Sequence, residues 1–162
     1  MQLQKRGRRM MNEILKKEKE YAEYIKEHIQ NVQLVYRKML YRGHFNGDSE
    51  WEGMLANNIG NHDQSKYETE FDGYRQWFYP CKDEIRNKDK FDFAWNYHQK
   101  TNPHHWQYWV MYKTDGSVAL DMPYQFIVEM LCDWTAMSIK FKNMPSEWYA
   151  KEIGRASCRE RV

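Results

Sequence analysis

Hydrophobic positions recur with helical spacing in the first quarter of the chain. Over residues 12–41, apolar side chains follow one another at steps of three, four or seven, so they lie on one face of a helix. The pattern predicts one long helix that ends near Gly43. The apolar positions are Ile14, Tyr21, Ile25, Ile29, Val32, Val35 and Met39.

Local signals divide the rest of the chain into shorter elements. Ser49 and Glu52 have the spacing of a capping box, which predicts a helix that starts there and runs towards His62. Further helices are predicted over residues 69–79, 89–100, 123–142 and 144–151, with a hairpin around Asp115-Gly116 within residues 111–120. The helix over residues 89–100 is expected to bury Phe91, Phe93, Ala94 and Trp95. Together these elements predict an all-α, single-domain bundle with at most one small β-hairpin.

Composition supports a folded, cytoplasmic protein. Hydrophobic residues make up 41% of the 162 residues, and their runs fall far short of the ~20 residues that cross a bilayer. The net charge of +2 gives no strong case for nucleic acid as a partner, and the oligomeric state stays open. The three cysteines are too few and too scattered for a disulfide framework, so we expect free thiols.

The two ends of the chain differ from the middle. Residues 1–11 are basic and precede the apolar pattern, so we interpret them as an N-terminal extension. Residues 153–162, IGRASCRERV, follow no apolar period and resemble the translation of a sequencing-adapter oligonucleotide. We predict that they are a non-native tail and that the folded domain covers residues 12–152.

Two ionisable residues interrupt predicted apolar faces. His28 shares the stripe of Ile25 and Val32 on the long helix, and Asp133 lies between Met130 and Met137 on a later one. A buried carboxylate costs several kcal/mol unless it is paired or bound to a metal. A core histidine with a hydrogen bond, and a salt bridge to a lysine or arginine, are the competing interpretations.

The adjacent pair His62-Asp63 adds two more candidate ligands on a third segment. Neighbouring residues can both bind one ion at a helix end, where the backbone lets their side chains converge. Mixed nitrogen and oxygen ligands suit Mn, Fe, Co, Ni or Zn better than Ca. The residues therefore predict a site for one or two divalent transition-metal ions.

The order His28, His62-Asp63, Asp133 resembles the HD superfamily of metal-dependent phosphohydrolases. The likeness implies an HD-like, all-helical core in which these four positions bind a divalent metal. It implies hydrolysis of a phosphomonoester or phosphodiester, with a nucleotide among the candidate substrates, by water that the metal activates. Asp63 would then be catalytic as well as a ligand.

Lys66, three residues after Asp63, refines the resemblance. The sequence HDQSK is similar to the HDxxK form of two-metal members, which include cyclic-dinucleotide phosphodiesterases and di-iron oxygenases. That likeness implies that Lys66 holds a substrate phosphate or another oxygen; a solvated surface lysine is the alternative.

Two further histidines occur in the HHWQYW stretch. Two-metal members place histidines between the HD pair and the last Asp, which makes His104 or His105 a candidate ligand for a second metal. An aromatic packing element is the other interpretation. A similar stretch occurs in HD-like proteins of bacteria and their phages, and this likeness adds no reaction.

Three hypotheses follow from the sequence. The first is the phosphohydrolase, the second is a di-iron oxygenase of the HDxxK kind, and the third is a non-enzymatic metal-binding or structural protein on the same scaffold. Their metal content, their oxygen consumption and their turnover of phosphate esters distinguish them.

Overall fold

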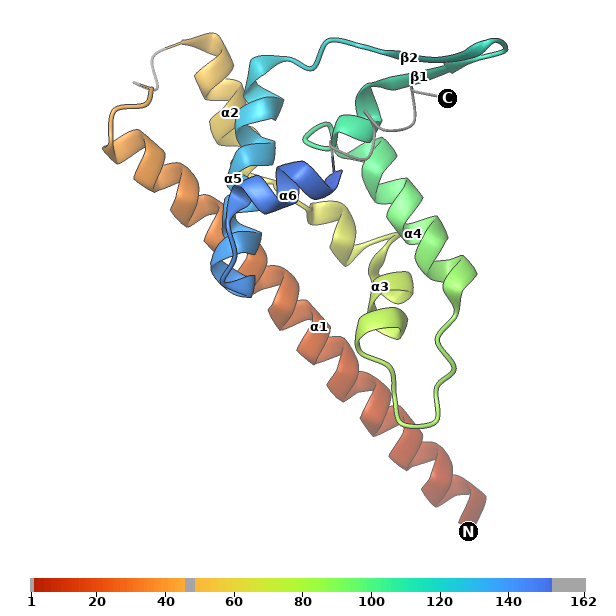
Figure 1. The fold of residues 1–162 in the computed structure, drawn as a ribbon. Helices are drawn as coiled ribbons and strands as arrows, with labels where there is room; N and C mark the ends of the chain where they lie inside the picture. The colour runs from red at the N-terminus through yellow and green to blue at the C-terminus, as the bar shows by residue number, and fades with distance from the viewer. Residues whose placement is uncertain (1, 46–48, 153–162) are drawn as a thin grey trace. The chain divides into compact units, whose positions relative to one another are not determined.

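The protein is an all-α domain with one small hairpin, as the sequence predicts (Figure 1). The structure is a computed structural model and describes residues 2–45 and 49–152. No helix in these two ranges has the length and apolarity needed to cross a membrane. The elements are α1 (Gln2–Tyr41), α2 (Glu50–Gly60), the 3-10 turn η1 (Gln64–Tyr67), α3 (Phe71–Phe78), α4 (Lys88–Thr101), the 3-10 turn η2 (Trp106–Trp109), β1 (Val110–Lys113), β2 (Gly116–Ala119), α5 (Tyr124–Phe141) and α6 (Pro145–Glu152).

Each predicted helix is present, and the main difference lies at the N-terminus. The helix expected from about residue 12 begins at Gln2, because residues 2–11 contain no proline and only Gly7 among strong helix breakers. The stretch interpreted as a basic extension is therefore helical over its described residues. The predicted non-native tail, residues 153–162, lies outside the described residues.

The capping box predicted at Ser49 is confirmed. The backbone N–H of Ser49 donates to the Glu52 carboxylate at 2.9 Å, and the Ser49 side chain completes the reciprocal pair. These bonds satisfy groups that a helix start leaves without partners. They fix the start of α2, which ends at Gly60, two residues before His62.

The chain forms two compact units. Unit 1 holds residues up to 27 and residues 63–120, and unit 2 holds residues 28–62 and 121 onwards. Helix α1 contributes to both units. The second boundary falls between His62 and Asp63, inside the predicted ligand pair. The prediction of a single domain over residues 12–152 stays a prediction.

In unit 1, α3 packs directly on α4 (Figure 1). The contact is close at Gly73, where an added Cβ would lie 2.6 Å from the carbonyl oxygen of Lys90 and 2.7 Å from the Cβ of Ala94. Next to it, the rings of Tyr21 and Tyr74 stack with their centroids 6.4 Å apart. Unit 1 is therefore built on aromatic packing and on one glycine that lets two helices touch.

The prediction that α4 buries Phe93 and Trp95 is wrong. Phe93 is 60% exposed and Trp95 is 38% exposed, whereas Ala94 and His98 are buried. Residues 94 and 98 lie one turn apart on the face that meets α3, and side chains one position away point about 100° aside. The small Ala94 sits at the contact because Gly73 lies opposite to it.

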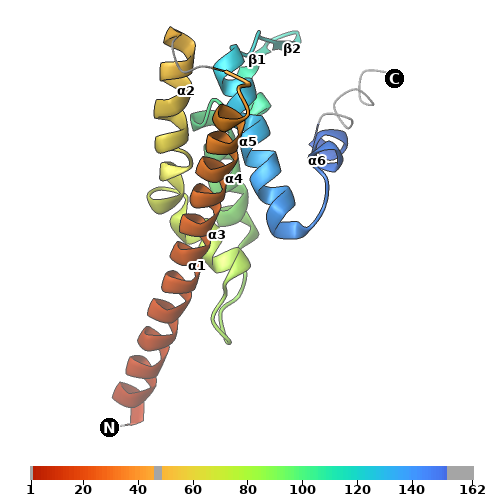
Figure 2. The same ribbon diagram turned by 90° about the vertical axis from the view of Figure 1, so that its left-hand side faces the viewer.

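In unit 2, α2 packs against α5, and α6 follows α5 after a short turn (Figure 2). Side chains from the last part of α1, from α2 and from α5 form one apolar cluster, in which Val32 and Leu55 are fully buried. The thiol of Cys132 lies in this cluster, where burial raises its pKa to about 12. This apolar support fixes the faces of α1 and α5 that carry His28 and Asp133. Its buried members are Val32, Val35, Leu55, Ile59, Val128, Cys132 and Ala136.

The predicted hairpin is confirmed. Strands β1 and β2 pair antiparallel, with Val110 opposite Ala119 and Lys113 opposite Gly116. Gly116 has φ = 141°, a conformation that side chains rarely adopt, so glycine is required at this turn.

A bidentate ion pair closes the segment after α3. The two terminal guanidinium nitrogens of Arg75 lie 2.6 and 2.7 Å from the carboxylate oxygens of Glu84, which also accepts from the backbone N–H of Cys81. The Arg75 guanidinium is the main cause that lowers the pKa of Glu84 to about 2.

We predict that Gly73→Ala lowers the free energy of unfolding by about 1–3 kcal/mol, because the new methyl group would overlap the backbone of Lys90. Gly53→Ala is the matched control, since nothing lies within 4 Å of its added Cβ and alanine favours a helix by up to about 1 kcal/mol. Urea unfolding at neutral pH measures both. Equal stability of the two variants would contradict the close contact.

We predict that the Arg75–Glu84 pair makes stability depend on pH in the acid range. The folded pKa of Glu84, about 2, lies below its ordinary value of 4.5. The pair therefore stabilises the fold above about pH 4.5, and this contribution is lost as the pH falls towards 2. Glu84→Gln should lower the free energy of unfolding at pH 7. It should also make this free energy fall less steeply between pH 5 and pH 2, as urea unfolding measures. Asp83→Asn, at the exposed neighbouring carboxylate, should keep the wild-type slope.

Candidate metal centres

Among residues 2–45 and 49–152, two buried groups of imidazole and carboxylate side chains are found, one in each unit. Histidine and carboxylate groups are rarely gathered in a core without a partner or an ion, because burying a charge is costly. The group in unit 2 comprises His28, His62, Glu129 and Asp133, and the group in unit 1 comprises Asp63, Glu70, His98, His104 and the half-buried His105.

In unit 2, the Asp133 carboxylate lies between two imidazoles. Its Oδ1 atom is 3.1 Å from Nε2 of His28 and 4.0 Å from Nε2 of His62. His28 comes from α1, Asp133 comes from α5, and His62 follows the end of α2. The ring centroids of the two histidines are 5.4 Å apart. Within unit 2, the structure therefore brings together the predicted ligands His28, His62 and Asp133.

Glu129, one turn before Asp133 on α5, supports this group. Its Oε1 atom lies 2.9 Å from Nδ1 of His62, and both side chains are buried. A carboxylate at Nδ1 favours the proton on that nitrogen, which leaves Nε2 as the lone-pair donor. The nitrogen that faces Asp133 is thus the one able to bind a metal.

In unit 1, Asp63 occupies a backbone conformation that is rare for a residue with a side chain. Its φ and ψ are 57° and 21°, in the left-handed region, directly before η1. Asp and Asn tolerate this region better than most residues. The turn buries the carboxylate, whose Oδ2 atom accepts a 2.6 Å hydrogen bond from Nζ of Lys66.

The other oxygen of Asp63 faces imidazoles. Its Oδ1 atom lies 3.4 Å from Nε2 of His98 and 3.4 Å from Nε2 of His104, and Nε2 of His105 is 2.8 Å from Nε2 of His98. One ligand atom from each of these four residues lies within 4.8 Å of the others. Ligands bonded at about 2.1 Å stand about 3.0 Å apart in an octahedron and about 3.4 Å apart in a tetrahedron. The separations of 2.8 and 3.4 Å fit a shared ion.

A glutamate also contacts His98, at the ring nitrogen that does not face Asp63. Oε2 of Glu70 lies 2.9 Å from Nδ1 of His98, and Glu70 is completely buried. Burial raises the pKa of Glu70 to about 7, although a hydrogen bond with Ser65 acts in the opposite direction. Burial and the charges on Glu70 and Asp63 also raise the pKa of the Tyr74 phenol.

The predicted site residues divide between the two units. His28, His62 and Asp133 lie together in unit 2, while Asp63 and Lys66 lie in unit 1 with His104 and His105. The single site shared by His28, His62, Asp63 and Asp133 stays a prediction. Both His104 and His105, and not only one of them, reach the group around Asp63.

Lys66 is not a solvated surface residue. Only 17% of its side chain is exposed, and its Nζ atom lies 5.9 Å from the ring centroid of Tyr74 as well as beside Asp63. The aromatic interpretation of the HHWQYW stretch is also incomplete, because His104 faces Asp63.

Two residues of the unit 1 group, His98 and Glu70, are not among the ligands predicted from the sequence, because the spacing of His98 from His104 is shorter than the resemblance implies and no pattern points to Glu70. His98 carries a usable signal, since it lies four residues after Ala94 on the buried face of α4. Glu70 carries none, because it belongs to the polar run Glu68-Thr69-Glu70, in which the other two residues are exposed.

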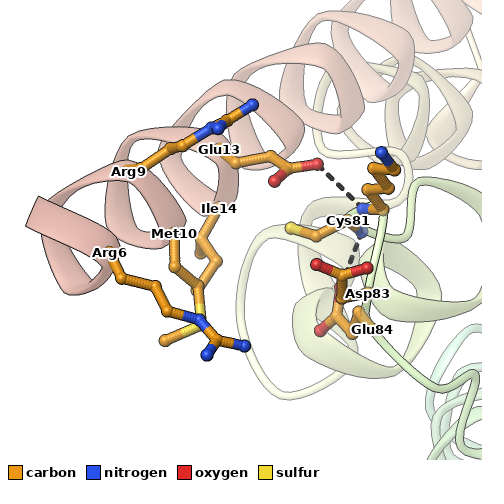
Figure 3. A pocket seen from close by; sticks show the side chains of 9 residues that line it. Arg6, Arg9, Met10, Glu13, Ile14, Cys81, Asp83 and Glu84 are labelled. Atoms are coloured by element: carbon orange, nitrogen blue, oxygen red, sulfur yellow. Dashed lines mark hydrogen bonds between the residues drawn. The ribbon is translucent and has the colours of Figure 1, made fainter. Parts of the chain in front are cut away.

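Unit 1 also has a cavity of about 570 Å³ that none of the predicted ligands lines (Figure 3). It lies between the start of α1 and the segment after α3. Glu13 accepts from the backbone N–H of Lys82 across it, and Glu84 accepts from that of Cys81. Two of its acidic side chains thus stabilise the backbone of the segment after α3.

We predict that the unit 1 group binds a divalent transition metal. His98→Ala and His104→Ala should each lower the amount of Mn²⁺, Co²⁺ or Zn²⁺ retained after dialysis, because each removes an imidazole nitrogen that faces Asp63. His44→Ala is the control, since His44 is an exposed histidine outside both groups. Elemental analysis of the purified proteins measures this. Equal metal content in all four proteins would contradict the assignment.

The comparisons with known proteins place the chain in a family and assign no reaction. No curated protein and no solved structure matches it. One family model, described as DUF5662, a family of unknown function, matches residues 17–161. This match spans every residue of the two buried groups. The chain therefore belongs to the DUF5662 family.

Proposed function

We propose that the protein is a metal-dependent phosphohydrolase that acts on a phosphomonoester or a phosphodiester, with nucleotides among its candidate substrates. The observation that carries the proposal is the buried cluster of Asp63, His98, His104 and His105, whose ligand atoms lie within 4.8 Å of one another. The HD-like order of His28, His62-Asp63 and Asp133 supports the same reaction class.

The donor chemistry fits a transition metal. Three imidazole nitrogens and one carboxylate oxygen form the unit 1 set, and His28, His62 and Asp133 offer a second mixed set in unit 2. Such mixed nitrogen and oxygen sets suit Mn, Fe, Co, Ni or Zn. The protein would accordingly hold one or two ions.

A bound ion would polarise a phosphoryl oxygen and lower the pKa of a bound water towards about 7, which supplies a nucleophile at neutral pH. The protein's own residues provide position and charge. Asp63 is fixed from two sides, with Lys66 at Oδ2 and imidazoles facing Oδ1. The burial of His98 and His104 keeps bulk water away from the ligand nitrogens.

Lys66 is the candidate contact for the substrate. Its ammonium group lies 2.6 Å from Asp63 Oδ2, and 17% of its side chain is exposed, so we expect a phosphoryl oxygen to reach it while the ligand set stays buried. A lysine acts here as a compact positive charge with three donors. Its role would be to bind and orient the phosphoryl group beside the ligands.

The proposal is tested with purified protein loaded with Mn²⁺ or Co²⁺ and a panel of phosphate esters. The panel contains p-nitrophenyl phosphate, bis-p-nitrophenyl phosphate, nucleoside monophosphates and cyclic nucleotides. We expect turnover by wild type. Asp63→Asn tolerates the same backbone conformation and should reduce turnover by more than about 100-fold, beyond the 10–100-fold that loss of an outer-shell partner costs. Lys66→Ala should retain the ion and raise KM, and His44→Ala should match wild type.

Other outcomes decide between the competing functions. Two equivalents of iron in the purified protein, with oxygen consumed during turnover, would indicate a di-iron oxygenase and contradict the phosphohydrolase. A metal that raises the melting temperature without turnover of any ester would point to a binding or structural protein. Full hydrolytic activity in Asp63→Asn would show that the reaction does not use this centre.

A further inference from the structure

Glu70 is a completely buried carboxylate that has no role in the proposed hydrolysis. It lies directly before α3, and its Oε2 atom is 2.9 Å from Nδ1 of His98. A neutral imidazole carries one N–H, and an ionised carboxylate can only accept. With Glu70 ionised, this contact places the proton of His98 on Nδ1, in competition with the side-chain amide of Asn102, whose Nδ2 atom lies 3.1 Å from the same nitrogen.

The opposite nitrogen of His98 is then unprotonated, and it is the one that enters the ligand group. Its Nε2 atom lies 3.4 Å from Asp63 Oδ1 and 2.8 Å from Nε2 of His105. Since His98 Nε2 accepts in this arrangement, His105 donates to it in the metal-free protein. For Nε2 of His105 to bind a metal, its proton would have to move to Nδ1 of the same ring.

From this geometry we infer that Glu70 is a positioning residue: its carboxylate fixes the tautomer and the ring orientation of His98, so that Nε2 is presented to the metal. The inference deepens the proposed function and rests on it for the metal. Carboxylate partners of this kind also raise the basicity of a ligating imidazole.

The same arrangement occurs a second time. In unit 2, Glu129 is buried and lies 2.9 Å from Nδ1 of His62, whose Nε2 faces Asp133 at 4.0 Å. Each unit thus contains a glutamate, a histidine held through Nδ1 and an aspartate near the other ring nitrogen. Two independent occurrences favour a shared role over a chance contact.

Fold stability alone does not explain Glu70. A side chain with no exposed surface at this position would usually stabilise the core more if it were apolar, because a buried carboxylate must be desolvated. The contact of its Oε2 atom with Nδ1 of His98 offsets part of this cost. A group kept in spite of its cost fits a positioning role.

Histidine ring NMR tests the tautomer without metal or substrate. Protein labelled with ¹⁵N-histidine is measured metal-free, and the signals of His98 are identified by their loss in His98→Gln. We expect His98 to carry its proton on Nδ1. A proton on Nε2 of His98 in the wild-type protein would overturn the inference.

Titration with Co²⁺ alone tests the consequence. Glu70→Gln keeps the size of the side chain and removes its charge, so Co²⁺ affinity should fall 10–100-fold. Glu68→Gln, two residues away and exposed, should bind as wild type does. Circular dichroism identifies any variant that fails to fold, and the wild-type NMR measurement decides in that case.

The outcomes separate this inference from the proposed function. Wild-type affinity in Glu70→Gln would overturn the inference alone. Tight Co²⁺ binding without hydrolysis of any ester would overturn the phosphohydrolase and leave the role of Glu70 intact. Failure of the wild-type protein to bind Co²⁺ would overturn both.

Discussion

The cost of burying charge governs this structure. Each unit removes two carboxylates and at least two imidazoles from water, in a chain whose stability comes mainly from apolar and aromatic packing. A carboxylate in such surroundings is tolerated only with close partners. The partners found are mostly histidines, which can give up their role as hydrogen-bond donors when a cation binds. The same energetic constraint that makes these groups expensive in a helical bundle makes them suitable as metal ligands.

The supporting packing explains how the groups are held. In unit 2, the apolar cluster around Val32 and Leu55 fixes the helix faces that carry His28 and Asp133. In unit 1, Gly73 lets α3 meet α4, and this contact aligns His98 with Glu70 at the start of α3. The left-handed turn at Asp63 then directs its two oxygens to different partners, a lysine on one side and imidazoles on the other. Helices thus carry His28, His98 and Asp133, whereas Asp63, His104 and His105 lie in the connecting segments.

The two buried groups contain the same arrangement of residue types, although different helices and turns carry them. In each, a glutamate contacts Nδ1 of a histidine, and an aspartate lies near the remaining nitrogen. The unit 1 group adds two histidines and a partly exposed lysine, so it combines a ligand set with a positive charge suited to an anionic substrate. This combination distinguishes a catalytic proposal from a purely structural one, since a structural metal site needs no substrate contact.

The sequence by itself determined the helices, the capping box at Ser49, the hairpin turn at Gly116 and the candidate ligands, because these depend on local spacing and on residue chemistry. Local periodicity could not decide which side of α4 is buried, and Phe93 lies on the exposed side because Gly73 admits only the small Ala94 at the helix contact. Nor could it find Glu70, which sits in a polar run and becomes buried only when α3 and α4 pack. Only the tertiary structure brought His98 and Glu70 together, because contacts between residues distant in sequence follow from packing and leave no periodic trace.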